Sequence, residues 1–452
     1  MKRISKILFT SFLLLIACQK ETNPLPSSRP VESKPASLRK GYVKAEGSEL
    51  LDENGDKFLL RGTNLGSYYL HERWMALTDS PDMLYTVNAL TKRFDRDAAF
   101  ELLDIYQENY WTDEDFSAVE EIGLNCLRLP ISYMDVFDLD FELMRSDDPT
   151  AESLRNMTLT LRKDHLKKMD KFISEAEKHG LYVILDLHGA YGSQNGNDHS
   201  IDSRQHDWLW RDDDVGEAFR ELTVELWTVL AEHYKDQKNI AAYDLLNEPA
   251  GDAQDPGCLT SVTGKKQWDF FDELYKAIRP IDPNHVIIME SCWGAENLPM
   301  PSVYGWNNVM YEFHHYDSAS EDAASIASHR YRVENIKNAH FGVPLYMGEF
   351  CPHCSYEGWA EILSLFNQNH IHWTNWNYRV KGFSEWGLFH IRTNNDGDPT
   401  LPISEIPSIA GGRDSFEEIE RKWGVDQRKG YSKNEALCEV ISSAAKENIN
   451  FE

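Results

Sequence analysis

The chain has 452 residues, 41% of them hydrophobic and 27% charged, which is enough for one large α/β barrel or two ordinary domains. Its formal net charge at pH 7 is −28. So acidic a protein disfavours nucleic acids and anionic polymers as partners, and it suits a neutral substrate.

The N-terminal residues are typical of an export signal. Three basic residues precede the apolar run 7–16, which is too short to span a bilayer. The run closes on Leu15-Ile16-Ala17-Cys18, which resembles a bacterial lipobox. This ending predicts removal of residues 1–17 and attachment of a lipid to Cys18. A plain secretory signal followed by a chance cysteine is the alternative.

The segment 18–40 is rich in Pro, Ser, Lys and Glu and has almost nothing to bury, which predicts a disordered tether behind the lipid. Gln19 replaces the aspartate that favours inner-membrane retention in enterobacterial lipoproteins. We therefore expect an exported protein held at the outer membrane or cell surface, with the periplasmic side as the alternative. Contact with the membrane is expected only through the lipid, and residues 41–452 are expected to form one domain.

The folded part begins with a hairpin signal, because Asn54-Gly55 separates two strand-like runs. Apolar strand-like runs then alternate with helical patterns about eight times. Helical spacing is clear over 164–179 and 217–233, and the segments 416–423 and 434–447 predict closing helices. The predicted strands are 58–64, 126–130, 182–188, 242–247, 286–290, 309–316, 344–349 and 372–377.

Alternation of this kind predicts an α/β fold, a (β/α)8 TIM barrel with an N-terminal β-hairpin on its floor and a C-terminal helical extension. Continuous apolar runs such as 183–187 are what a strand buried on both faces requires. In such barrels the active site lies at the C-terminal ends of the strands.

Two of the predicted strands end on a glutamate, in Asn247-Glu248-Pro249 and in Gly348-Glu349-Phe350. A chain buries Glu reluctantly and usually with a partner. Either motif alone is compatible with a strand that ends in a solvated acid. Together they predict paired carboxylates in one pocket, the groups that hydrolyse a glycosidic bond.

Other predicted strand ends carry polar or aromatic groups. Arg128 lies near the end of the second strand, His188 ends the third and Trp376 lies near the end of the eighth. On the sixth strand we choose His314 rather than His315, because alternation puts residues 314 and 316 on one face. Core histidines and a structural ion pair at Arg128 are the alternatives.

Two further motifs suggest metal or thiol chemistry as alternatives. His370-Ile-His372 has the spacing of metal-dependent barrel hydrolases, but it begins the eighth strand and so lies at the wrong end of the barrel. We expect no metal and no cofactor. Cys351-Pro-His-Cys354 looks like a thiol-disulfide exchange motif, which requires a helix N-terminus in a thioredoxin-like setting. A structural thiol pair or a disulfide is the preferred interpretation.

Several longer motifs resemble glycoside hydrolase family 5 over most of residues 58–390, and most closely its exo-β-1,3-glucanase branch. These motifs are Gly62-Thr-Asn64-Leu-Gly66 with Leu70-His-Glu72-Arg-Trp74, Trp111-Thr-Asp-Glu-Asp-Phe with Gly123-Leu-Asn-Cys-Leu-Arg-Leu-Pro, and Asp186-Leu-His-Gly-Ala-Tyr-Gly-Ser-Gln-Asn-Gly196.

The resemblance implies a retaining mechanism with Glu248 as general acid/base and Glu349 as nucleophile, their carboxyl groups about 5–5.5 Å apart. Arg128 and Tyr316 are expected to keep Glu349 ionised. Apolar surroundings and the charge of Glu349 are expected to raise the pKa of Glu248. By the same resemblance, the sugar is held by Asn247 at its 2-hydroxyl, by His188 and His314, by Trp376 as a floor and by Glu72.

One departure concerns the leaving group. The exo-glucanase branch follows its Gln-Asn-Gly with an aromatic clamp, whereas here Gln194-Asn-Gly196 is followed by Asn197-Asp198-His199. The leading expectation is a monomeric exo-β-1,3-glucanase acting on a β-glucan oligo- or polysaccharide. An endo-β-glucanase or another β-glucosidase of the family is the first alternative. A non-catalytic carbohydrate-binding lipoprotein is the alternative from another class.

Overall fold

The computed structural model describes residues 41–249, 261–291, 295–382, 384–393 and 399–451. The predicted signal peptide, the lipidated Cys18 and the tether lie outside the described residues. So do Cys258 and Cys292.

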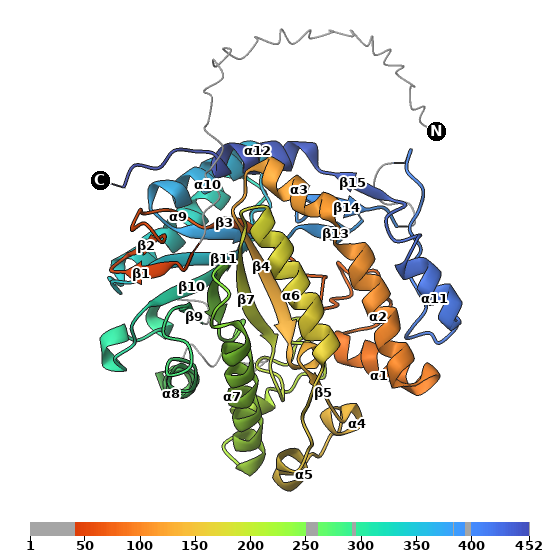
Figure 1. The fold of residues 1–452 in the computed structure, drawn as a ribbon. Coiled ribbons are helices and arrows are strands. Elements are labelled where there is room, and N and C mark those ends of the chain that lie inside the picture. The colour runs from red at the N-terminus through yellow and green to blue at the C-terminus, as the bar shows by residue number, and fades with distance from the viewer. Residues whose placement is uncertain (1–40, 250–260, 292–294, 383, 394–398, 452) are drawn as a thin grey trace, which may run out of the picture. The chain divides into compact units, whose positions relative to one another are not determined.

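Eight parallel strands close into one barrel, in the chain order that the sequence predicts (Figure 1). Each predicted apolar run overlaps one of these strands, so the predicted (β/α)8 barrel is confirmed. The strands are β3 (Arg61–Asn64), β4 (Cys126–Ser132), β7 (Tyr182–Gly189), β8 (Ile240–Asp244), β9 (Val286–Glu290), β10 (Val309–Tyr316), β11 (Leu345–Cys351) and β12 (His372–Asn375).

Helices lie around the barrel, as Figure 1 shows for α3, α6 and α7 beside β4 and β7. The helices between strands are α1 (Met83–Phe94), α2 (Arg96–Tyr110), α3 (Asp113–Ile122), α4 (Phe141–Met144), α5 (Ala151–Arg155), α6 (Lys163–Lys178), α7 (Asp214–Tyr234), α8 (Ser261–Ile278), α9 (Asp322–Asn338) and α10 (Tyr356–Gln368). The predicted C-terminal extension is present as α11 (Phe416–Trp423) and α12 (Glu435–Ala445). None of the described helices has the length and apolarity needed to cross a membrane.

The fifth βα unit departs from the prediction. Between β9 and β10 the described residues form only two 3-10 turns, Ala295–Asn297 and Pro301–Val303. Two small additions flank the strand ends: the ribbon of β5 (Phe137–Asp138) and β6 (Thr160–Leu161), and a sheet of β13 (Arg379–Lys381), β14 (Phe389–Ile391) and β15 (Tyr431–Lys433).

The N-terminal hairpin pairs β1 (Lys44–Glu46) with β2 (Glu49–Leu51), so its turn lies at Gly47-Ser48 rather than at the predicted Asn54-Gly55. The later turn exists, but only a single bridge between Leu51 and Lys57 follows it. Val43, Leu50 and Phe58 of this region are buried in one apolar cluster with the first interior residues of the strands. The hairpin therefore closes the barrel floor, as expected.

Strand β7 shows how the interior changes from floor to mouth. Val183, Leu185 and Leu187 belong to the outer core beneath the helices, while Tyr182 and Ile184 belong to the floor cluster. Since side chains alternate along a strand, Asp186 and His188 continue the interior face. The barrel is therefore apolar at its floor and polar at its C-terminal mouth.

Candidate active site

The polar half of the barrel is organised around Arg128, which is fully buried on β4. Its guanidinium donates to Oδ2 of Asp244 at 2.8 and 3.0 Å, to Oδ1 of Asn247 at 2.9 Å and to Oε1 of Glu349 at 2.8 Å. The planar guanidinium has five N–H donors and can make these four hydrogen bonds at once, one more than an ammonium group can donate. Arg128 is thus both a barrel-interior ion pair and a direct contact of Glu349.

Glu349 lies on β11 and is 4% exposed. Arg128 holds its Oε1, and the hydroxyl of Tyr316 on β10 donates to its Oε2 at 2.7 Å. Both contacts expected from the sequence are therefore present. They fix the carboxylate plane by charge-assisted hydrogen bonds, which are stronger than neutral ones.

Glu248 lies four residues beyond the end of β8 and has a φ of 41°, a left-handed conformation that a non-glycine residue rarely adopts. Its backbone N–H donates to Oε2 of Glu290 at 2.5 Å. Its carboxylate lies between two imidazoles, with Oε1 at 3.0 Å from Nδ1 of His314 and Oε2 at 3.1 Å from Nε2 of His199. Unusual backbone geometry of this kind is concentrated at functional sites.

The two glutamates converge on a common point. A carboxylate oxygen of Glu248, a carboxylate oxygen of Glu349 and a ring nitrogen of His314 all lie within 4.8 Å of one another. This spacing agrees with the separation of about 5–5.5 Å found in retaining glycosidases, and it is shorter than the 6.5–9.5 Å or so of inverting enzymes.

A cavity of about 470 Å³ opens above the pair. It is lined by Glu72, Trp74, His188, His199, Glu248, Tyr316, Glu349, Trp376 and Trp386. Of the nine residues predicted from the sequence, six line the cavity. Arg128, Asn247 and His314 do not line it. Arg128 contacts Glu349, His314 contacts Glu248, and Asn247 is held by Arg128.

Aromatic rings form the walls of this cavity. Trp376 is stacked on His188, with ring centres 5.4 Å apart and planes 11° from parallel. Trp386 contacts Trp74 and Tyr316, with centroids at 5.4 and 5.3 Å. Flat apolar walls with a few polar groups are typical of sites for small ligands, and aromatic faces suit the apolar faces of sugar rings.

Sequence reasoning did not assign a site role to three of the cavity residues, Trp74, His199 and Trp386. Trp386 lies between β13 and β14, a segment without a recognisable motif. His199 lies in the stretch where the sequence departs from the exo-glucanase pattern, and this departure was the one signal available for it.

The tandem histidines separate as alternation predicts. His314 faces the glutamates, whereas Nε2 of His315 contacts the hydroxyl of Ser328 on α9 at 2.9 Å. His315, Asp317 and His329 lie close enough together to hold a cation. However, Nδ1 of His329 already contacts the carbonyl of Ser325 and Asp317, so these atoms are used in packing α9 against β10.

The pKa expected for Glu248 is wrong for this structure. Burial by itself raises the pKa of a carboxyl group, but the hydrogen bonds and charges of His199 and His314 outweigh burial and hold the pKa of Glu248 well below its usual range. At Glu72, by contrast, the effect of burial on the pKa is larger than that of the neighbouring groups. Burial raises its pKa to about 8, although His199 lowers it and Trp74 Nε1 donates to its Oε2 at 2.6 Å.

The four described cysteines are free, so the disulfide considered for Cys351 and Cys354 is not present. Cys351 ends β11, and the following helix begins only at Tyr356. Burial raises the pKa of both thiols, which disfavours the thiolate needed for exchange. The structure thus offers no support for thiol-disulfide chemistry at this motif.

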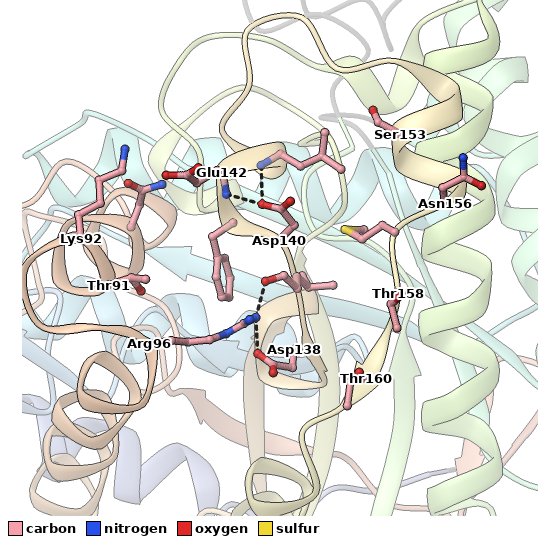
Figure 2. Close-up of a pocket in the computed structure, with 15 residues that line it drawn as sticks. Thr91, Lys92, Arg96, Asp138, Asp140, Glu142, Ser153, Asn156, Thr158 and Thr160 are labelled. Atoms are coloured by element: carbon pink, nitrogen blue, oxygen red, sulfur yellow. Dashed lines mark hydrogen bonds and ion pairs between the residues drawn. The ribbon is translucent and has the colours of Figure 1, made fainter.

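A larger hollow of about 710 Å³ lies beside α1, β5 and α4 (Figure 2). Its charged groups serve the local fold: Arg96 pairs with Asp138, and Oδ1 of Asp140 accepts from the backbone of Glu142 and Leu143 at the start of α4 (Figure 2). This hollow lacks the converging carboxylates of the barrel mouth.

Comparisons with known proteins agree with this site. The family model described as Cellulase (glycosyl hydrolase family 5) matches residues 92–382. A protein named Beta-xylosidase from Phanerodontia chrysosporium is 28% identical over 77% of this chain and 73% of its own. A Glucan 1,3-beta-glucosidase from Blumeria graminis is 30% identical over 64% of this chain, which spans 62% of that relative's length.

Among solved structures, an endogalactoceramidase matches with a TM-score of 0.54 at 16% identity, over 89% of this chain and 84% of the other. At this identity the likeness concerns the fold alone, and it agrees with the closed barrel. The family model, by contrast, matches more than half of the chain and includes both Glu248 and Glu349. The chain belongs to glycosyl hydrolase family 5.

Proposed function

We propose that the protein is a retaining β-glycosidase that hydrolyses β-glucans, with exo-type β-1,3-glucanase activity as the leading specificity. The observation that carries this proposal is the approach of Glu248 and Glu349 to within 4.8 Å of each other at one cavity. A pair this close leaves no room for water between nucleophile and sugar, so the reaction proceeds by double displacement.

In the first step, Glu349 attacks the anomeric carbon while Glu248 protonates the departing glycosidic oxygen. Arg128 and Tyr316 hold Glu349 by its two oxygens, so the nucleophile needs no reorientation. In the second step, Glu248 removes a proton from water, which attacks the anomeric carbon and releases Glu349.

Two unpartnered polar atoms support sugar binding at this site, one on the cavity-lining Glu72 and one on Asn247. Among the described residues, Nδ2 of Asn247 and Oε1 of Glu72 are buried and have no hydrogen-bond partner. Arg128 fixes the Asn247 amide through Oδ1, which leaves Nδ2 to donate to the sugar 2-hydroxyl. Oε1 of Glu72 is available for a hydroxyl at the far end of the sugar. Both residues bind substrate in this proposal, as the family resemblance implies.

The size of the cavity favours exo action. Its volume of about 470 Å³ is in the range of about 300–1,000 Å³ for small-molecule pockets, rather than that of a long polymer cleft. Trp74 and Trp386 contact each other edge to face in the wall of this cavity. An endo-β-glucanase remains the alternative, and the xylosidase relative adds β-xylosides as substrates to be tested.

The mechanism is tested with Glu349→Gln on aryl β-glucosides. The variant is expected to fold normally by circular dichroism and to lose about four orders of magnitude or more in kcat. An activated 2-deoxy-2-fluoro β-glucoside should label the peptide that contains Glu349, as read by mass spectrometry. Parental turnover by the variant, or a label on another residue, would contradict the proposal.

Linkage and mode of action are tested by product analysis on laminari-oligosaccharides, cello-oligosaccharides and gentiobiose, with aryl β-xyloside as a comparison. Release of glucose alone from the laminari series supports the leading specificity, and a ladder of products supports the endo alternative.

We further propose that the protein is an exported monomer anchored through a lipid on Cys18 at the outer membrane or cell surface. Metabolic labelling with a fatty acid, lost in Cys18→Ala, tests the anchor.

A further inference from the structure

The loop after β7 fixes a histidine against the acid/base glutamate. His199 lies on the 3-10 turn Asp198–Ser200. Two side chains of the same loop hold the backbone around Glu248: Nε2 of Gln194 donates to the carbonyl of Asn247 at 2.9 Å, and Nδ2 of Asn195 donates to the carbonyl of Glu248 at 3.1 Å. The distance between His199 and Glu248 is therefore set by the fold and not by a free surface contact.

His199 and His314 contact opposite oxygens of Glu248, but their surroundings differ. His314 is buried beneath the cavity, whereas the His199 side chain is 27% exposed and lines the cavity itself. His199 thus lies on the side from which a leaving group reaches Glu248. It belongs to the stretch Asn197-Asp198-His199 that stands in place of the aromatic clamp.

We propose that His199 and Glu248 share one proton, and that His199 passes this proton to Glu248 when a leaving group fills the cavity. This inference rests on the proposed role of Glu248 as acid/base. It makes His199 a positioning residue for the proton, which acts on the substrate only through Glu248.

Each proton can be followed through the two steps of the reaction. In the free enzyme the proton is on Nε2 of His199, facing the Glu248 carboxylate at 3.1 Å. Substrate displaces water from the pair, and loss of water favours the neutral pair over the ion pair. The proton moves to Oε2 of Glu248 and then to the glycosidic oxygen as the bond to the anomeric carbon breaks. In the second step Glu248 takes a proton from water and returns it to His199.

The charges around His199 agree with this resting state. Burial opposes a charge on the imidazole, but Glu248, Glu72 and Asp198 outweigh burial and raise the pKa of His199 to about 9. The groups that face Glu248 are His199, His314, Glu290, Glu349 and Tyr316. Since the two histidines keep Glu248 ionised, it lacks the proton that a general acid must deliver, and His199 is the partner on the substrate side that holds one.

The experiment compares His199→Gln with the parent protein on aryl β-glucosides of decreasing leaving-group acidity. Dinitrophenyl glucoside needs no acid assistance, whereas phenyl glucoside does. We expect kcat/KM of the variant to fall by roughly 10–100-fold on phenyl glucoside and by less than about 3-fold on dinitrophenyl glucoside. The alkaline limb of the phenyl glucoside profile should move to lower pH by about one unit or more, because Glu248 alone loses its proton earlier. His233→Gln, which removes an exposed histidine paired with Asp170, is the matched control.

An equal loss on all leaving groups, or an unchanged alkaline limb, would overturn the inference and leave His199 as a binding residue only. Glu248→Gln tests the route of the proton: it should abolish the phenyl glucoside reaction, and retention of that reaction would make His199 itself the acid and refute transfer through Glu248. Failure of the proposed function is separate, since it would appear as turnover by Glu349→Gln.

Discussion

The hydroxyl of Tyr316 donates to Oε2 of Glu349 at 2.7 Å, across the β10–β11 strand pair in which His314 lies opposite Glu349. This bond holds the oxygen of Glu349 that Arg128 does not hold. It also ties the nucleophile to the aromatic wall, because the Tyr316 ring contacts Trp386.

Tyr316→Phe keeps the ring and removes this bond. A hydrogen bond to a charged group is worth about 1.5–3 kcal/mol, so we expect kcat on an aryl β-glucoside to fall by roughly 10–150-fold with little change in the melting temperature. Tyr331→Phe, at a tyrosine that is 72% exposed, is the control and should leave both quantities unchanged. Full activity in Tyr316→Phe would show that Arg128 alone orients Glu349.

Arg128→Met tests whether the barrel interior depends on this one cation. The substitution leaves Asp186, Asp244 and Glu349 in a buried site without their positive partner. Breaking a buried ion pair in this way costs about 3–5 kcal/mol, so denaturant unfolding should show a large loss of stability.

Arg155→Met removes an exposed arginine that pairs with Glu221, and it should change the unfolding free energy by no more than about 1 kcal/mol. If Arg128→Met were as stable as this control, the buried acids would have to be neutral in the folded protein.

Much of the fold could be predicted because its signals are local. A run such as 183–187 is buried on both faces, and the closure of eight such strands follows from their alternation with helices. The fifth unit could not be predicted in this way, since the described residues between β9 and β10 form 3-10 turns instead of a helix. The N-terminal hairpin also turns earlier than predicted, because Gly47, with a φ of 59°, forms a tighter turn than the one predicted at Asn54-Gly55.

The site residues that could be predicted are those that lie at the end of a strand within a recognisable motif, as Glu349 and Tyr316 do. The pKa of Glu248 was not predictable, because it depends on His199, a residue 49 positions away in sequence whose orientation is set by a loop. Sequence reasoning considered apolar burial and the charge of Glu349 and missed the second imidazole. Contacts between loops of different units carry no periodic signal.

Glu72 is expected to make stability depend on pH. Burial raises its pKa in the folded protein to about 8, whereas in the unfolded chain it is close to the reference value of about 4.3. Between these values the folded state binds the extra proton, so this residue lowers stability as pH rises from about 4.5 to 8. Glu72→Gln removes the proton uptake, and its melting temperature should therefore fall less than that of the parent between pH 5 and pH 8.

The matched control is Glu101→Gln, at an exposed position of α2, which should keep the parental slope of melting temperature against pH. Identical slopes for Glu72→Gln and the parent would mean that Glu72 is ionised in the folded protein at neutral pH.

Asn247 gives the sharpest test of sugar orientation. Its Nδ2 is buried without a partner among the described residues, while Oδ1 is held by Arg128. We expect Asn247→Ala to lower kcat/KM by roughly 100-fold on an aryl β-glucoside, because the bond to the 2-hydroxyl strengthens in the transition state. On the corresponding 2-deoxyglucoside the same substitution should cost less than about 5-fold, since the hydroxyl is already missing. Measuring both substrates with both proteins gives the equivalent of a double-mutant cycle. In this comparison, any effect of the substitution on Arg128 that is common to both substrates cancels. Equal losses on both substrates would place the 2-hydroxyl away from Asn247 and would require a different orientation of the sugar above Glu349.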